Sequence, residues 1–155
     1  MAEKKEHMRW QLRAPGGATW HWSVAGEDLE VHTTYVGDAL KSVLQSARDL
    51  QLGSGSSIAL LLSEPGGTRV FFSGAEEEVY VQVVQFSDLQ SVDNRWAGGQ
   101  PRWSGRISTS GFIDDVRSMA EQLLSEVGES RYLKEWGHPF PSRELQALHG
   151  HTPAD

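Results

Sequence analysis

Three consecutive apolar runs in the middle of the chain constrain its fold more than any other feature. They read SSIALLLSE, TRVFFSG and EEVYVQVVQF, and they occupy residues 56–64, 68–74 and 77–86. The links between them are only a few residues long, which predicts that neighbouring strands run antiparallel. Each run is apolar at successive positions, so both faces of these strands need cover and the strands are predicted to be central.

Further elements flank this group of strands. TWHWSVAGEDLEVHTTYV alternates in polarity and predicts a hairpin that turns near Gly26-Glu27, with Trp20 and Trp22 on its buried face. WSGRISTSG predicts a last strand. Two segments have the apolar periodicity of helices. One spans residues 38–53, between the hairpin and the three runs, with Asp38 as N-cap, and the other begins at residue 111, after the last strand, with Ser110 or Thr109 as N-cap. Two shorter helices, within ESRYLKEWG and RELQALHG, complete the order.

Together these elements predict an α+β fold with a single antiparallel sheet of about six strands in the order β-β-α-β-β-β-β-α-α-α. The major helices are expected to pack on one face of that sheet. Residues 1–17 are expected to form a mobile N-terminal arm, residues 18–150 a single α+β domain, and residues 151–155 a frayed tail. Because the helices cover one face only, the other face keeps apolar side chains, and we expect a homodimer to bury them.

Composition restricts the classes of partner. The 155 residues contain no cysteine, which excludes disulfides, thiolate nucleophiles and cysteine-based zinc sites. No apolar run reaches the roughly 18 residues of a membrane span, and no apolar region follows the charged N-terminus. We therefore expect a cytoplasmic protein. The net charge of −7 disfavours nucleic acid and anionic membranes. It is compatible with a basic protein partner, and a role in solubility alone is the alternative that we favour.

Three polar residues of the first hairpin are the candidates for catalysis. A turn at Gly26-Glu27 places His21 opposite His32 and near Glu30, on the face away from the tryptophans. Two imidazoles and a carboxylate that close together could hold a divalent metal or transfer protons. An ordinary polar strand face is the alternative, and we favour it. No metal and no cofactor is therefore predicted.

The segment Asn94–Trp103, NRWAGGQPRW, is the candidate for partner binding. It places an Arg-Trp pair on either side of Gly-Gly-Gln-Pro within a long predicted loop. Trp and Arg are the residues most enriched at binding hot spots. Arg95, Trp96 and Arg102 are therefore predicted to contact a partner, while Trp103 is expected to begin the last strand and point into the core. Trp96 folding back over a sheet edge is the competing interpretation.

The C-terminal stretch RYLKEWGHPFPSREL resembles that of uncharacterised small actinobacterial α+β proteins, some of the immunity-protein type. The similarity is carried by Tyr132 and Trp136, which match a Tyr-x3-Trp segment, and by His138, Phe140 and Pro141, which match a His-x-Phe-Pro stretch. GDALKSVLQSA resembles their first half. The resemblance implies a bacterial protein that binds another protein. The segment with the two Arg-Trp pairs departs from the pattern.

The motifs of nucleotide-binding loops, serine hydrolases and zinc proteases are missing from the sequence. We therefore predict a non-enzymatic protein-binding module, of immunity type or a regulatory partner of another protein. Two alternatives stay open. One is a small tailoring or isomerising enzyme that uses His21, Glu30 and His32, and the other is a small-molecule carrier with a pocket between sheet and helices.

Overall fold

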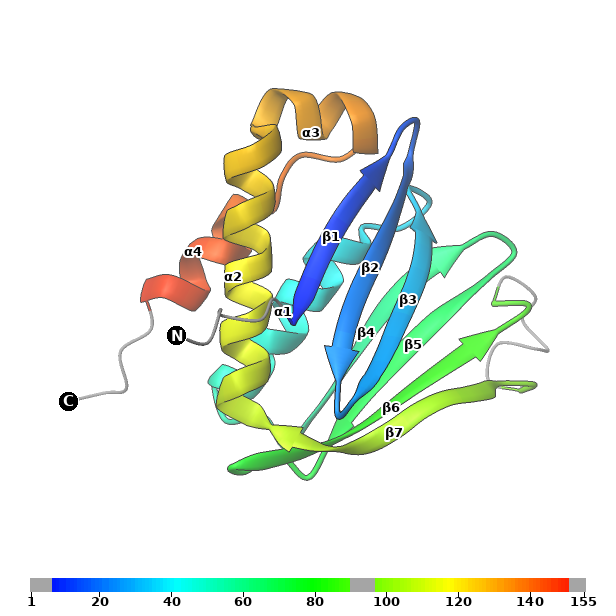
Figure 1. The fold of residues 1–155 in the computed structure, drawn as a ribbon, viewed down its shortest axis with the longest axis vertical. Coiled ribbons are helices and arrows are strands. Elements are labelled where there is room, and N and C mark those ends of the chain that lie inside the picture. The colour runs from blue at the N-terminus through cyan, green and yellow to red at the C-terminus, as the bar shows by residue number, and fades with distance from the viewer. Residues whose placement is uncertain (1–6, 90–96, 151–155) are drawn as a thin grey trace.

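The computed structural model describes residues 7–89 and 97–150, which form two antiparallel sheets and four helices (Figure 1). The first sheet has the order β1-β2-β3 and the second the order β4-β5-β6-β7. The strands are β1 (Met8–Arg13), β2 (Gly17–Val24), β3 (Glu27–Thr34), β4 (Ser56–Ser63), β5 (Gly66–Ser73), β6 (Glu78–Phe86) and β7 (Gln100–Ser108). The helices are α1 (Ala39–Gln51), α2 (Thr109–Val127), α3 (Glu129–Trp136) and α4 (Ser142–Gly150). The predicted α+β class is confirmed.

The prediction of a single sheet of about six strands is wrong, because β3 does not pair with β4. The free edge of β4 is covered by side chains instead. The Leu60 N–H donates to Ser42 Oγ of α1 at 2.8 Å, and the Thr33 hydroxyl donates to the Leu62 carbonyl at 2.7 Å. These side chains take up backbone groups that a neighbouring strand would use, so the two sheets meet at one end without joining.

Strand β1 lies in the segment that we expected to be a mobile arm, and that expectation is wrong for residues 8–13. Met8 and Trp10 are buried against the core, while Arg9 and Gln11, which alternate with them, are exposed. β1 pairs with β2 along its whole length, from Met8 opposite Trp22 to Arg13 opposite Gly17. The alternation of apolar and polar residues provides the buried face that holds this strand on the sheet.

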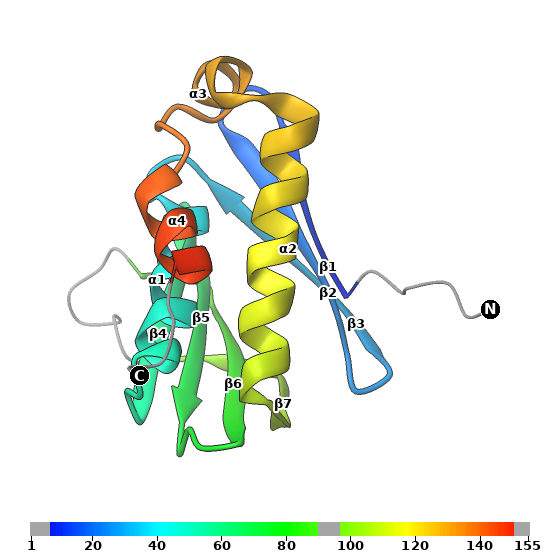
Figure 2. The ribbon, with the colours of Figure 1, turned by 90° about the vertical axis from the view of Figure 1, so that its left-hand side faces the viewer.

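The two long helices pack against each other and cover the inner faces of both sheets (Figures 1 and 2). α1 lies along β4, whereas α2 contacts β1, β6 and β7. The N-cap of α2 is Ser108, whose Oγ accepts from the Gly111 N–H at 3.1 Å, so helix α2 begins slightly earlier than predicted. Asp38 occupies the predicted N-cap of α1 but makes no capping hydrogen bond there. Among the described residues no helix is long and apolar enough to span a membrane.

The core is centred on aromatic side chains from four elements, β2, β5, β7 and α2. Trp22 stacks on Trp20 with ring centroids 5.1 Å apart, and it meets Trp103 of β7 edge-on at 6.0 Å. Phe112 of α2 lies 5.7 Å from Trp22 and 4.9 Å from Phe72 of β5. The predicted inward orientation of Trp103 is confirmed. One aromatic cluster therefore joins the first sheet, the second sheet and α2.

The outer face of the second sheet carries apolar side chains. Ile58 is 49% exposed, and Phe71, Tyr80 and Val84 are half-buried. The strand pairings place Ile58 beside Phe71 and Phe71 beside Gln82 on this face. A homodimer through this surface stays a prediction.

Helix α3 closes the end of the first sheet with two fully buried aromatic residues. Tyr132 packs on Phe140 at 5.2 Å, and neither the Tyr132 hydroxyl nor Trp136 Nε1 has a hydrogen-bond partner among the described residues. Burial, and to a smaller extent the negative charge of Asp38, raises the pKa of Tyr132 far above its ordinary value of about 10.

This raised pKa predicts an alkaline loss of stability. Below pH 10 the Tyr132 phenol is protonated in both the folded and the unfolded chain, so its contribution is constant. Above about pH 10 only the unfolded phenol ionises, and the free energy of unfolding falls by about 1.4 kcal/mol per pH unit from this residue. Urea unfolding at pH 9 and pH 11 measures the loss, and Tyr132→Phe is expected to remove that part of it. An equal loss in both proteins would contradict the prediction.

Candidate functional site

A cleft of about 750 Å³ separates β3 from the second sheet. One wall is the segment Asp28–His32 of β3. The other wall comes from the β4–β5 turn with the residues on either side of it, from the end of β6 and from one residue of β7. Its residues are Ser63, Pro65, Gly66, Gly67, Thr68, Val83, Gln85, Phe86, Ser87 and Arg102. Figure 2 shows that the β2–β3 hairpin diverges from the second sheet toward its tip. The volume lies within the roughly 300–1,000 Å³ typical of ligand sites.

The β3 wall owes its position to a two-residue turn. Ala25 and Gly26 form the turn, with φ angles of 50° and 79°, and Val24 pairs with Glu27 across it. Positive φ at both positions is the geometry of a type I′ turn, whose twist matches that of the flanking strands. The turn therefore fixes which residues of β3 lie opposite which residues of β2.

This register differs from the expected one. His21 lies opposite Glu30, not His32, and His32 lies opposite Thr19. His21 Nδ1 is 3.4 Å from Glu30 Oε1, whereas His32 Nδ1 is 3.0 Å from Thr19 Oγ1. The expected pairing of the two histidines is therefore wrong. Within residues 7–89 and 97–150, no three His, Asp or Glu side chains are gathered closely enough to hold a metal ion.

The side chains on this face of the first sheet are linked in pairs across the strands. The Ser23 hydroxyl donates to Asp28 Oδ1 at 2.7 Å, and the Arg13 Nε–H donates to Thr19 Oγ1 at 2.9 Å. Asp28 and Glu30 remain exposed, so they give the β3 wall a negative charge. His32 is exposed beside them.

The opposite wall of the cleft is partly apolar. Val83 is 2% exposed and Phe86 6% exposed, and the Arg69 guanidinium lies over the Phe86 ring, 4.9 Å from its centroid. Gly66 allows the backbones of β5 and β6 to approach closely here, and Gly67 allows the same for β5 and β4. A Cβ on Gly66 would lie 2.1 Å from the Phe86 carbonyl oxygen. Close backbone contacts of β5 at the two glycines therefore fix the position of this wall.

Arg102 is the predicted partner-binding residue that the structure places in the cleft. It follows Pro101 and precedes Trp103, at the point where the β6–β7 register shifts between Val83 and Val84. Such a bulge changes the direction of a side chain relative to the ladder. Arg102 is exposed and faces the same cleft as Glu30 and His32. Arg95 and Trp96 lie outside the described residues.

Sequence reasoning missed Asp28, Thr68 and Phe86 as parts of this site. Asp28 stands directly after the turn, and its role depends on the register that the turn sets. The glycine pair after Pro65 was the available signal for the second wall, because adjacent glycines in a hairpin often mark a close backbone approach.

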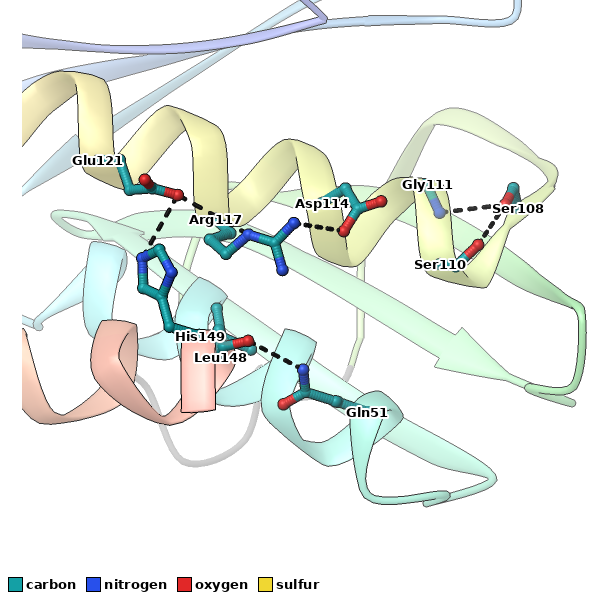
Figure 3. A network of polar contacts seen from close by, with 9 residues as sticks. All are labelled: Gln51, Ser108, Ser110, Gly111, Asp114, Arg117, Glu121, Leu148 and His149. Carbon is teal, nitrogen blue, oxygen red and sulfur yellow. Dashed lines mark hydrogen bonds and ion pairs between the residues drawn. The ribbon is translucent and has the colours of Figure 1, made fainter. Parts of the chain in front are cut away.

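A second hollow, of about 520 Å³, lies between α2 and α4. Leu124 and Leu145 line it together with polar residues of both helices. Two of these, Glu121 and His149, face each other with Oε1 and Nε2 3.4 Å apart (Figure 3). Glu121 also forms an ion pair with Arg117, whose Nε lies 3.7 Å from Glu121 Oε1, and Arg117 pairs with Asp114 one turn earlier at 2.7 Å. The contact between Glu121 and His149 joins α4 to α2, while the two arginine pairs lie within α2.

Neither a protein-family model nor a curated protein matches the chain. Among solved structures, a chain of the CdiA-CT/CdiI toxin and immunity complex from Enterobacter cloacae matches with a TM-score of 0.47 and 13% sequence identity. The alignment covers 74% of this chain and 99% of that chain. The resemblance to actinobacterial proteins stays a prediction from the sequence.

Proposed function

We propose that this protein is a binding module that receives part of another protein in the cleft between its two sheets. The observation that carries the proposal is the lining of that cleft. Charged side chains from strands far apart in the sequence, Asp28 and Glu30 on one wall and Arg102 on the other, face one open space beside buried apolar residues. Polar anchors around an apolar floor are the usual composition of a recognition site.

The charges of the cleft favour a basic partner. The net charge of −7 attracts a basic surface over a distance, and the exposed carboxylates of β3 then meet it at short range. An immunity-type or regulatory role, as the sequence suggests, is one form of this activity. The enzyme alternative is less favoured by the register, because His21 and His32 have different partners.

The proposal is tested by truncating Arg102. We expect Arg102→Ala to weaken capture of the native partner from a host lysate, quantified by mass spectrometry, because truncating a hot-spot arginine costs about 2 kcal/mol or more. Arg106→Ala is the matched control, since Arg106 is exposed on the same strand but does not line the cleft. Equal capture by the two variants would remove the cleft from the proposed function.

A further inference from the structure

The backbone of β3 has one edge that no described strand uses. In a hairpin with a two-residue turn, the residues next to the turn exchange hydrogen bonds, and every second residue after them does the same. Val24 and Glu27 are that first pair here, so Leu29, Val31 and Thr33 bond to β2. The N–H and C=O groups of the residues between them point the other way, and these residues are Asp28, Glu30 and His32.

This outward edge lies along the cleft. The five residues of the β3 wall line it continuously, and β3 pairs only with β2 in the described part of the chain. No backbone hydrogen bond joins Asp28, Glu30 or His32 to a described residue beyond the hairpin. The free edge of β4, in contrast, is covered, because Ser42 and Thr33 bond to its outward backbone groups.

We propose that the partner's segment enters the cleft as an extended strand and adds to the edge of β3 as the fourth strand of the first sheet. The inference rests on the proposed function and specifies how the same cleft recognises its partner. In such strand addition the backbone hydrogen bonds supply affinity, and alternate side chains supply specificity.

The two sides of the added strand meet different surfaces. The side chains of Asp28, Glu30 and His32 project to one face of the first sheet, the face away from Trp20 and Trp22. Side chains of the added strand on that face lie about 5 Å from them, where lysine and arginine are favoured. The alternate side chains turn toward the floor of the cleft, where Val31, Val83 and Phe86 are buried. The occupant is therefore a segment that alternates basic and apolar residues.

A second copy of this chain fits the edge poorly. Antiparallel pairing of β3 with β3 of another copy, centred on Glu30, sets Glu30 opposite Glu30 of that copy. Like charges directly opposite each other destabilise a strand pair, and charged side chains are a common protection of free edges. The carboxylates that keep copies apart are the groups that a basic strand neutralises.

The experiment uses two synthetic probes and two variants of the full chain. The first probe is a capped peptide of about eight residues with alternating lysine and valine. The second has the same sequence with the backbone nitrogens on one edge methylated, which removes donors and blocks pairing on that edge. Glu30→Pro removes the outward N–H of β3 without removing a bond to β2, and proline is tolerated on strand edges. Glu30→Gln removes only the charge.

We expect the wild-type chain to bind the plain peptide and to protect the amides of Asp28, Glu30 and His32 from hydrogen exchange. N-methylation of the peptide edge that faces β3 should weaken binding about tenfold or more, and so should Glu30→Pro. Glu30→Gln should weaken binding only a few-fold. Circular dichroism of Glu30→Pro confirms that it is folded; should it unfold, the methylated peptide with the wild-type chain decides instead.

Equal binding of plain and methylated peptides, or no binding of either, overturns strand addition. A dimer that appears at high concentration by light scattering and is lost in Glu30→Pro overturns it too, since a second copy then occupies the edge. The proposed function fails separately, when Arg102→Ala captures the partner as well as Arg106→Ala does.

Discussion

Replacing Trp22 by alanine is expected to lower the free energy of unfolding by about 4 kcal/mol, the largest effect of a single substitution that we predict. Trp22 is 3% exposed and contacts Trp20, Trp103 and Phe112, so its removal opens a cavity where both sheets meet α2. A chain of this kind is stable by about 5–15 kcal/mol, so the variant keeps a small margin or unfolds. Urea titration followed by far-ultraviolet circular dichroism measures the change.

The control for this prediction is Ile58→Ala on the outer face of the second sheet. Ile58 is also a large apolar strand residue, but it is 49% exposed, so its truncation is expected to change the free energy of unfolding by less than about 1 kcal/mol. Comparable losses in the two variants would mean that the aromatic cluster is not the centre of the core.

Replacing Gly66 by alanine is expected to lower the free energy of unfolding by about 3 kcal/mol. The added Cβ would lie 2.1 Å from the Phe86 carbonyl oxygen and 2.9 Å from the Ser87 carbonyl carbon. Both neighbours are backbone atoms, so the β5–β6 ladder has to move apart to admit the methyl group. The same displacement would move the wall of the cleft that Phe86 forms.

Gly55→Ala is the matched control, because no atom lies within 4 Å of the position of its added Cβ. This substitution restricts the unfolded chain without a clash, so its effect is expected to stay within about 1 kcal/mol of zero. Thermal unfolding of both variants at one protein concentration compares them. A stable Gly66→Ala protein would show that the two strands tolerate a wider separation than the structure has.

Much of the local structure could be predicted from the sequence. The runs around Leu60, Phe71 and Val81 are strands of one antiparallel sheet in their sequence order, as their short links require. The helical stripes at 38–53 and from residue 111 correspond to α1 and α2. β1 carried a usable signal as well, since Met8 and Trp10 alternate with polar residues, but the run is short and rich in arginine.

The register of the first hairpin was harder to predict for a definite reason. The turn uses Ala25 at a φ of 50°, a conformation that residues other than glycine seldom adopt. The sequence therefore favoured a turn that begins at Gly26, which moves the pairing of β2 and β3 by two residues. The histidine pair was predicted from that register, and the observed turn separates the two residues.

The sequence by itself determined the helices and strands other than β1, because their periodicity and short links act over a few neighbouring residues. Only the tertiary structure decided that the strands divide into two sheets and that Arg102 faces Asp28 and Glu30 across a cleft. The physical reason is that the division depends on which groups cover the edge of β4. Ser42 and Thr33 come from separate elements, and they reach Leu60 and Leu62 only after the core has brought α1 and β3 beside that strand.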